Sequence, residues 1–210
     1  MLSSSLNTVL YKYIYIYIMV NEKEKQYWNI FYNSSQLESY GSSNFCMFIM
    51  NYFNDIKLFK ILDAGCGNGR DSFHLASKYN VIGVDNSGYK PTDTENCKFQ
   101  ISNFVTMDKN DYDLIYSRFT FHSITNNDHT LFLESINRHT YLCIETRSDK
   151  GIMNDRYHGD THYRNFTNLE YIKQLLNDNN FKIMYIEENI NFAVYKNEDP
   201  ICIRVICKKN

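Results

Sequence analysis

The chain has 210 residues, of which 43% are hydrophobic and 22% charged, and its formal net charge is −2. These values predict one folded α/β domain with an N-terminal extension. They exclude a disordered chain and offer no broad basic surface for nucleic acid. The six cysteines form no Cys-x-x-Cys pair and lie mostly within apolar runs, which predicts buried, reduced thiols and a cytoplasmic location rather than disulfides or a zinc site.

The first part of the chain contains a run between Val9 and Val20 in which Tyr and Ile alternate. The run is too short to span a bilayer, and it lacks the basic start and the cleavage site of a signal peptide. Because Met19 precedes a polar segment that could begin the protein, we expect residues 1–20 to be a dispensable extension and the chain to have no membrane span.

Strands and helices alternate along most of the chain. We expect helices at residues 21–33, 45–53, 70–79, 126–137 and 167–177, the last with Thr167 as N-cap, and strands at residues 60–63, 80–85, 98–102, 112–117, 141–145, 181–187 and 200–207. Gly88 and Pro91 lie in the link over residues 86–96, so its crossover helix should be short or absent. The last two strands should be joined by a tight connection. This order predicts a mixed seven-stranded sheet with helices on both faces.

The segment Ile61–Arg70 carries the strongest functional signal. An apolar strand runs into Asp63, and a Gly-x-Gly-x-Gly turn at Gly65, Gly67 and Gly69 then leads into a helix. Glycine lets the backbone approach a ligand closely, and a helix N-terminus follows. The spacing differs from the dinucleotide fingerprint Gly-x-Gly-x-x-Gly, and the acid would repel a pyrophosphate but suits an ammonium and a sulfonium. A turn that serves only chain reversal is the alternative.

This segment resembles motif I of the Rossmann-like (class I) S-adenosylmethionine-dependent methyltransferases, and the resemblance extends from about Gln26 to the end of the chain. It implies a Rossmann-like methyltransferase domain over residues 58–210 with the strand order 3-2-1-4-5-7-6, in which strand 7 is antiparallel. It also implies S-adenosylmethionine as the cofactor. Residues 21–57 would then form a helical lid over the cofactor, with Trp28, Tyr32 and Phe45 as its covering side chains.

Further cofactor contacts are expected where the next strands end. Asp85 ends an apolar run and should accept hydrogen bonds from the ribose hydroxyls, although alone it could be a turn residue. Asn103 and Phe104 follow the third strand, where the family commonly contacts the adenine; a turn Asn beside a core Phe is the alternative. The predicted cofactor-binding residues are Asp63, Gly65, Cys66, Gly67, Gly69, Arg70, Asp85, Asn86, Asn103, Phe104 and Ser117.

The acceptor is expected beside the fourth and fifth strands. The segment Asp111–His122 lies at the motif IV position but carries no Asn/Asp-Pro-Pro-Tyr/Phe signature, which argues against methylation of nucleic-acid bases. Arginine is suited to bidentate binding of carboxylate or phosphate. The predicted substrate-binding residues are Arg118, His122, Arg147 and Arg164, and they suggest an anionic acceptor. These charges could instead pair among themselves or be solvated.

A hydroxyl acceptor gains from a base, and histidine is the natural base near neutral pH. His162 is the first choice, with His158 and Glu145 as alternatives. The spacing of the two histidines could suit a metal on a helical face, but Gly159 and the polar composition argue against a helix, so no metal site is predicted.

Several short segments are similar to a microbial sub-group of these enzymes that is found among genes for capsule and other surface glycans. They include Trp28–Tyr32, Tyr116–Phe119, Glu145–Asp149 and His162–Arg164. The similarity implies O-methylation of a sugar, a glycan precursor or a related small polar acceptor. A thiol, a metalloid or a small amine could replace that acceptor, and a protein that binds the cofactor without transfer is a further alternative. The oligomeric state is not predicted.

Overall fold

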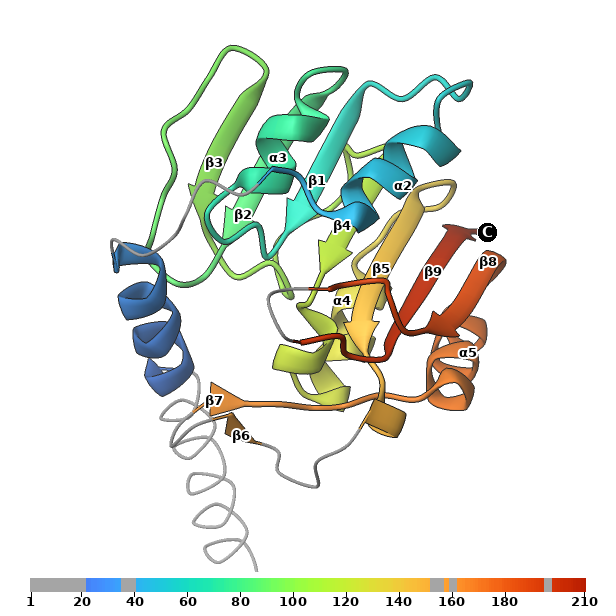
Figure 1. Ribbon diagram of the computed structural model, residues 1–210. Coiled ribbons are helices and arrows are strands. Elements are labelled where there is room, and N and C mark those ends of the chain that lie inside the picture. Colours follow the sequence, from blue (N-terminus) through green and yellow to red (C-terminus); the bar gives the residue numbers. More distant parts are fainter. Residues whose placement is uncertain (1–21, 35–40, 152–156, 159–161, 195–197) are drawn as a thin grey trace, which may run out of the picture.

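The computed structural model describes residues 22–34, 41–151, 157–158, 162–194 and 198–210, so the predicted extension at residues 1–20 lies outside it. A seven-stranded sheet has the order β3-β2-β1-β4-β5-β9-β8 (Figure 1). The strands β6 (Tyr157–His158) and β7 (His162–Tyr163) form a separate pair. When the seven strands of the large sheet are numbered along the chain, their order is 3-2-1-4-5-7-6. The predicted mixed seven-stranded sheet with this strand order is confirmed.

Five parallel strands form most of the sheet. They are β1 (Lys60–Ala64), β2 (Asn80–Asp85), β3 (Cys97–Ile101), β4 (Leu114–Arg118) and β5 (Tyr141–Arg147). The central strands β1, β4 and β5 are almost continuously buried, as expected for parallel strands that are covered on both faces. Their carboxyl ends lie at one edge of the sheet, which is the edge where open α/β sheets bind ligands.

The last two strands are antiparallel, as the predicted fold requires. β8 (Phe181–Asn189) pairs with β9 (Cys202–Lys209), and β9 pairs with β5. The prediction of a tight connection is wrong, because the chain from residue 190 to residue 201 lies between the two strands. This longer loop brings further side chains to the carboxyl edge of the sheet.

Helices cover both faces of the sheet. α2 (Asn44–Tyr52) and α3 (Arg70–Leu75) contribute to one hydrophobic cluster, while α4 (Asn126–Glu134) and α5 (Leu169–Asp178) contribute to the other. The predicted link without a helix at residues 86–96 is confirmed. Residues 22–33 are helical and lie near the carboxyl edge (Figure 1). In the part of the chain that the structure describes, no helix combines the length and the apolarity of a membrane span.

Two helices are shorter than predicted, and a third starts later. α3 and α4 each end before a serine whose hydroxyl donates to a carbonyl of the last turn, Ser77 to His74 at 2.7 Å and Ser135 to Phe132 at 2.8 Å. Such bonds compete with continuation of the helix. The predicted N-cap of α5 is wrong: the side chain of Asn168, not of Thr167, accepts the bond from the Tyr171 N–H.

Candidate active site

A cavity of about 640 Å³ opens at the carboxyl edge of the parallel strands. Its wall includes the glycine turn after β1, the ends of β2 and β4, the segment after β3, residues 22–33 and the loop between β8 and β9. The predicted site residues that line it are Asp63, Gly65, Cys66, Gly67, Arg70, Asp85, Asn86, Asn103, Phe104, Arg118, His122, Arg147 and Arg164. The structure therefore brings together most of the side chains that the sequence suggested.

The glycine turn is held by close packing as well as by its backbone conformation. Gly65 and Gly67 have φ angles of +79° and +54°, in the left-handed region that other residues avoid. A Cβ atom at Gly65 would lie 2.0 Å from the Thr120 methyl group, and one at Gly67 would lie 2.5 Å from the Tyr32 hydroxyl oxygen. Two segments distant in the sequence thus pack directly onto the turn.

Asp85 connects this turn to the end of β2. Its Oδ2 accepts a hydrogen bond from the Gly67 N–H and its Oδ1 accepts one from the Ser87 N–H, both at 2.9 Å. A carboxylate oxygen can accept more than one hydrogen bond. The group is therefore oriented in the wall of the cavity and can still accept from ligand hydroxyl groups.

Asp63 is fully buried at the end of β1 and accepts a bond of 2.5 Å from the Ser72 hydroxyl. Burial raises the pKa of Asp63 to about 7, although the Ser72 hydrogen bond opposes the shift; the nearby carboxylates Asp71 and Asp85 also raise it. Three acidic groups thus surround the turn. A bound cation would favour ionisation of Asp63.

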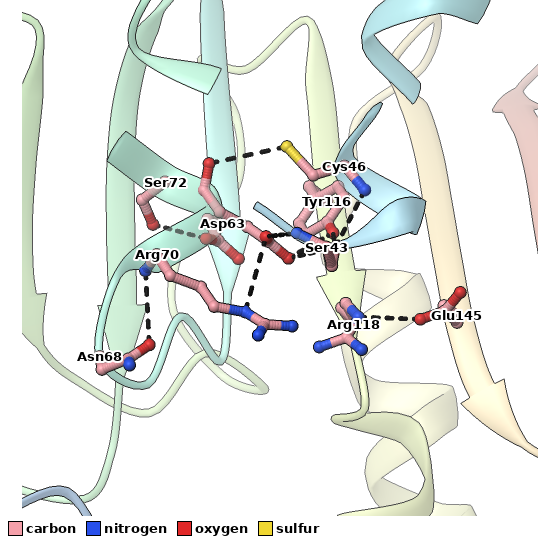
Figure 2. A network of polar contacts seen from close by, with 10 residues as sticks. Ser43, Cys46, Asp63, Asn68, Arg70, Ser72, Tyr116, Arg118 and Glu145 are labelled. Carbon is pink, nitrogen blue, oxygen red and sulfur yellow. Dashed lines mark hydrogen bonds and ion pairs between the residues drawn. The ribbon is translucent and has the colours of Figure 1, made fainter. Parts of the chain in front are cut away.

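A network that sequence reasoning missed fixes Asp71. The Ser43 N–H and hydroxyl each donate to this carboxylate at 2.7 Å, and the Tyr116 hydroxyl donates at 2.8 Å (Figure 2). Asp71 and Tyr116 line the cavity. The position of Asp71 in the first helical turn after the glycine motif could have indicated a site residue. The sequence around Ser43 and Tyr116 gave no such indication, because only the fold brings these residues to Asp71.

Two predicted cofactor-binding residues do not line the cavity. A Cβ atom at Gly69 would lie 2.8 Å from the Phe99 ring, so this glycine serves packing between the turn and β3. Ser117 is fully buried, and its hydroxyl pairs with that of Thr120. Both positions stabilise the loops that form the wall.

The structure also corrects the placement of Glu145. Its side chain is 0% exposed and does not line the cavity. One oxygen accepts from Arg118 Nε at 2.8 Å and the other from Arg204 Nε at 2.7 Å. Burial raises the pKa of Glu145, while both arginines lower it. A carboxylate enclosed by two guanidinium groups is an ion-pair partner, not an available base.

Arg147 and Arg164 lie together at another part of the cavity. Arg147 contacts Glu198 at 3.1 Å, and the Nε atoms of both arginines are buried with no hydrogen-bond partner among the described residues. Burial lowers the pKa of Arg164, and the Arg147 charge lowers it further. Two adjacent cations with unused donors favour a bound anion.

Of the three histidines predicted for the site, only His122, predicted to bind the substrate, has a side chain in the described part of the structure. It is buried, lines the cavity, and its ring centroid lies 5.2 Å from that of Phe119. The φ of Phe119 is +60°, a strained value for a non-glycine residue that is common at functional sites. His158 and His162 belong to the paired strands β6 and β7, but their side chains lie outside the described part of the structure.

The helix over residues 22–33 covers the cavity with aromatic side chains. Trp28 and Tyr32 line the cavity and stack with their ring centroids 5.6 Å apart. Glu24 accepts a hydrogen bond of 2.9 Å from the Tyr163 N–H, which joins this helix to β7. The predicted lid residue Phe45 does not line the cavity; it is fully buried in the core.

The comparisons with known proteins agree with this geometry. Residues 61–141 match the family model of a methyltransferase domain, and this segment runs from β1, which precedes the glycine turn, to the start of β5. This part of the chain therefore matches a methyltransferase domain, and the solved structures that share the fold of the chain include S-adenosylmethionine-dependent methyltransferases. No curated protein matches the sequence.

Solved structures of methyltransferases share the fold of this enzyme. A methyltransferase from Methanosarcina mazei is 18% identical, with a TM-score of 0.61 over 77% of this chain and 96% of that one. One from Anabaena variabilis is 16% identical, with a TM-score of 0.66 over 91% and 95% of the two chains. The 1,6-didemethyltoxoflavin-N1-methyltransferase from Burkholderia thailandensis is 16% identical, with a TM-score of 0.62 over 79% and 77%, and its structure contains S-adenosylhomocysteine.

The residues of the cavity fit this cofactor. S-adenosylmethionine carries an ammonium and a sulfonium group, and the carboxylates of Asp63, Asp71 and Asp85 lie around the glycine turn. Phe104 and Val105 provide an apolar part of the same wall. The cavity thus offers negative charge, part of the backbone of the glycine turn and an apolar surface within one volume.

Proposed function

We propose that the enzyme methylates an oxygen of a small polar acceptor that carries a negative charge, such as a sugar or glycan precursor with a carboxylate or phosphate. The observation that carries this proposal is the adjacent pair Arg147 and Arg164, whose buried Nε atoms have no partner among the described residues. A bidentate anion would supply acceptors for both groups. Glu198 would be displaced from Arg147 or would accept a hydroxyl of the acceptor.

The cofactor roles follow from the positions around the turn. In this proposal Asp63 and the backbone from Gly65 to Gly67 hold the methionine part of the cofactor, and Asp85 accepts hydrogen bonds from the ribose. Asn103 and Phe104 would contact the adenine. Their support is that all of them line one cavity, at the edge where this fold binds ligands.

The chain's contribution to the reaction is alignment, exclusion of water and acceptance of a proton. When bound, the cofactor supplies an electrophilic methyl group. The acceptor oxygen forms the new C–O bond as the C–S bond breaks, the electron pair stays on sulfur, and the hydroxyl proton must pass to a base. We propose His122 as this base because its side chain lies in the cavity wall; His162 and His158, on the paired strands β7 and β6, remain candidates.

The wider assignment is part of the same proposal. Segments that resemble the surface-glycan sub-group support glycan modification as the role, and the net charge of −2 supports a small-molecule acceptor over nucleic acid. The division into a dispensable extension at residues 1–20, a lid at residues 21–57 and a catalytic domain at residues 58–210 remains a prediction, as does a cytoplasmic location. A nitrogen acceptor is the second candidate, because the toxoflavin-precursor enzyme shares this fold.

The test is a methyl-transfer assay on matched acceptor pairs that differ only in a carboxylate or phosphate. We expect methylated product, seen as a mass increase, mainly from the anionic member of each pair. Arg147→Gln and Arg164→Gln should each raise KM for that acceptor about tenfold or more, since a charged hydrogen bond contributes about 1.5–3 kcal/mol. Arg138→Gln is the matched control, because Arg138 is exposed and donates to the Asn210 carbonyl near the end of the chain. Equal transfer to charged and neutral acceptors would refute the proposal.

A further inference from the structure

We infer that Arg118 binds the carboxylate of the cofactor's methionine part, and that Glu145 and Arg204 are positioning residues that hold its guanidinium group in place. The inference rests on the proposed cofactor site. The sequence suggested that Arg118 binds the acceptor, whereas this inference assigns it to the cofactor. Arg147 and Arg164 then remain as the two arginines for the acceptor.

The electrostatic neighbours of Arg118 place it with the glycine turn. Burial raises the pKa of Asp63 and that of Tyr32, which packs onto Gly67, and the charge of Arg118 opposes both shifts. By contrast, the cation that acts on Arg164 is Arg147. The three arginines therefore form two groups. The ring of Phe119 contacts both, with the guanidinium carbon of Arg118 at 4.3 Å and that of Arg147 at 5.7 Å.

The charges on this side match an amino-acid zwitterion. The methionine part of the cofactor carries its ammonium and its carboxylate on one carbon atom. Asp63 suits the first group, and Arg118, which lies within its electrostatic reach, suits the second. Asp71 contributes to the negative field around Arg118 but makes no direct ion pair with it among the described residues. Its oxygens accept from Ser43 and Tyr116, and Oδ1 lies 3.8 Å from Arg70 Nε.

The register of three neighbouring strands fixes the orientation of Arg118. Arg118 on β4 pairs with Glu145 on β5, which pairs in turn with Arg204 on β9. Arg118 donates through Nε to Glu145 at 2.8 Å, so its terminal nitrogens keep the two-pronged face that a carboxylate binds. These nitrogens belong to a side chain that is 18% exposed and lines the cavity.

Arg204 makes the other side of Glu145 rigid. Its Nη2 donates to the Phe192 carbonyl at 2.8 Å, and its guanidinium carbon lies 4.1 Å from the Phe192 ring centroid and 5.4 Å from that of Phe45. Within this row, two cations share one carboxylate. A carboxylate from a ligand would give the terminal nitrogens of Arg118 an acceptor of opposite charge.

The experiment is calorimetric titration of the full chain with two ligands. S-adenosylhomocysteine contains the amino-acid part, and 5′-methylthioadenosine is the corresponding nucleoside thioether without it. Arg118→Met should weaken S-adenosylhomocysteine binding about tenfold or more, which corresponds to about 1.4 kcal/mol, and change methylthioadenosine binding less than about twofold. Glu145→Gln should produce a smaller loss with the same ligand selectivity. Arg138→Met is the matched control and should change neither affinity, because Arg138 is exposed and does not line the cavity.

Each outcome decides the inference. Equal weakening of both ligands by Arg118→Met would overturn it, as would unchanged binding together with a raised acceptor KM, which would assign Arg118 to the acceptor. If Arg118→Met does not fold, Arg118→Lys replaces it; a loss confined to S-adenosylhomocysteine supports the inference and no loss overturns it. Wild-type protein that binds neither ligand would refute the cofactor site itself. If Arg118→Met weakens only S-adenosylhomocysteine binding but the wild type methylates no anionic acceptor, the inference stands and only the proposed acceptor is refuted.

Discussion

The buried carboxyl group of Asp63 makes the stability of the ligand-free enzyme depend on pH. The pKa of Asp63 in the folded protein is about 7, against an ordinary value of 3.8. The folded state therefore holds its proton at pH values where the unfolded chain has lost it. By linkage, this group lowers the free energy of unfolding as the pH rises from about 4 to 7. The full difference corresponds to about 4 kcal/mol at about 1.4 kcal/mol per pKa unit.

Asp63→Asn tests this reasoning, because the amide cannot ionise and its oxygen can still accept from Ser72. Between pH 5 and pH 8 the free energy of unfolding of the wild type should fall by about 2.5 kcal/mol more than that of the variant. Urea unfolding of both proteins at several pH values measures the difference, and titrating groups that do not interact with Asp63 cancel in the comparison. A difference between wild type and variant that stays constant over this range would refute the assignment of the pKa.

The same carboxylate should link cofactor binding to proton release. The ammonium and sulfonium groups favour ionised Asp63, so the affinity of the wild type for S-adenosylmethionine should rise about tenfold from pH 6 to pH 8. Calorimetry in buffers of different ionisation enthalpy should detect the released proton near pH 6. Asp63→Asn should bind more weakly and lose this part of the pH dependence, whereas Ser72→Ala should shift it to higher pH, because the Ser72 bond lowers the pKa.

Three further substitutions probe the turn and the fold. Gly67→Ala, which places a methyl group against Tyr32, should weaken S-adenosylhomocysteine binding about tenfold or more by calorimetry; Gly41→Ala, with no atom within 4 Å of its new Cβ, should not. Asn168→Ala removes the cap of α5 and should lower the free energy of unfolding in urea by about 1 kcal/mol. Lys109→Met removes a fully buried ammonium group that donates to two carbonyls and a hydroxyl. It should lower the midpoint of thermal unfolding and reduce the free energy of unfolding by about 2 kcal/mol.

The strand order and the glycine corner could be predicted because their signals are local. The apolar run before Asp63, the alternating glycines and the second apolar run that ends in Asp85 each lie within a few residues, and the strand boundaries fall within two residues of the prediction. Local patterns of this kind report backbone geometry directly. They identified a ligand-binding edge before any long-range contact was known.

The direction of each side chain at that edge could not be predicted in the same way. Glu145 lies near the end of β5 as expected. Its neighbours across the sheet are Arg118 and Arg204, and ion pairs with both bury its carboxylate. The contact between Ser43 and Asp71 likewise joins residues 28 positions apart. Such pairings depend on tertiary packing, which a single sequence does not report.

The row of Arg118, Glu145 and Arg204 also restricts which substitutions this enzyme can accept during evolution. Its members come from three strands that are separated along the chain but adjacent in the sheet. Loss of the central carboxylate alone would leave two buried cations without their partner, at a cost of about 3–5 kcal/mol. The three positions are therefore expected to be inherited as a unit, and a neutral or charge-reversed row should become accessible only when several of them change together.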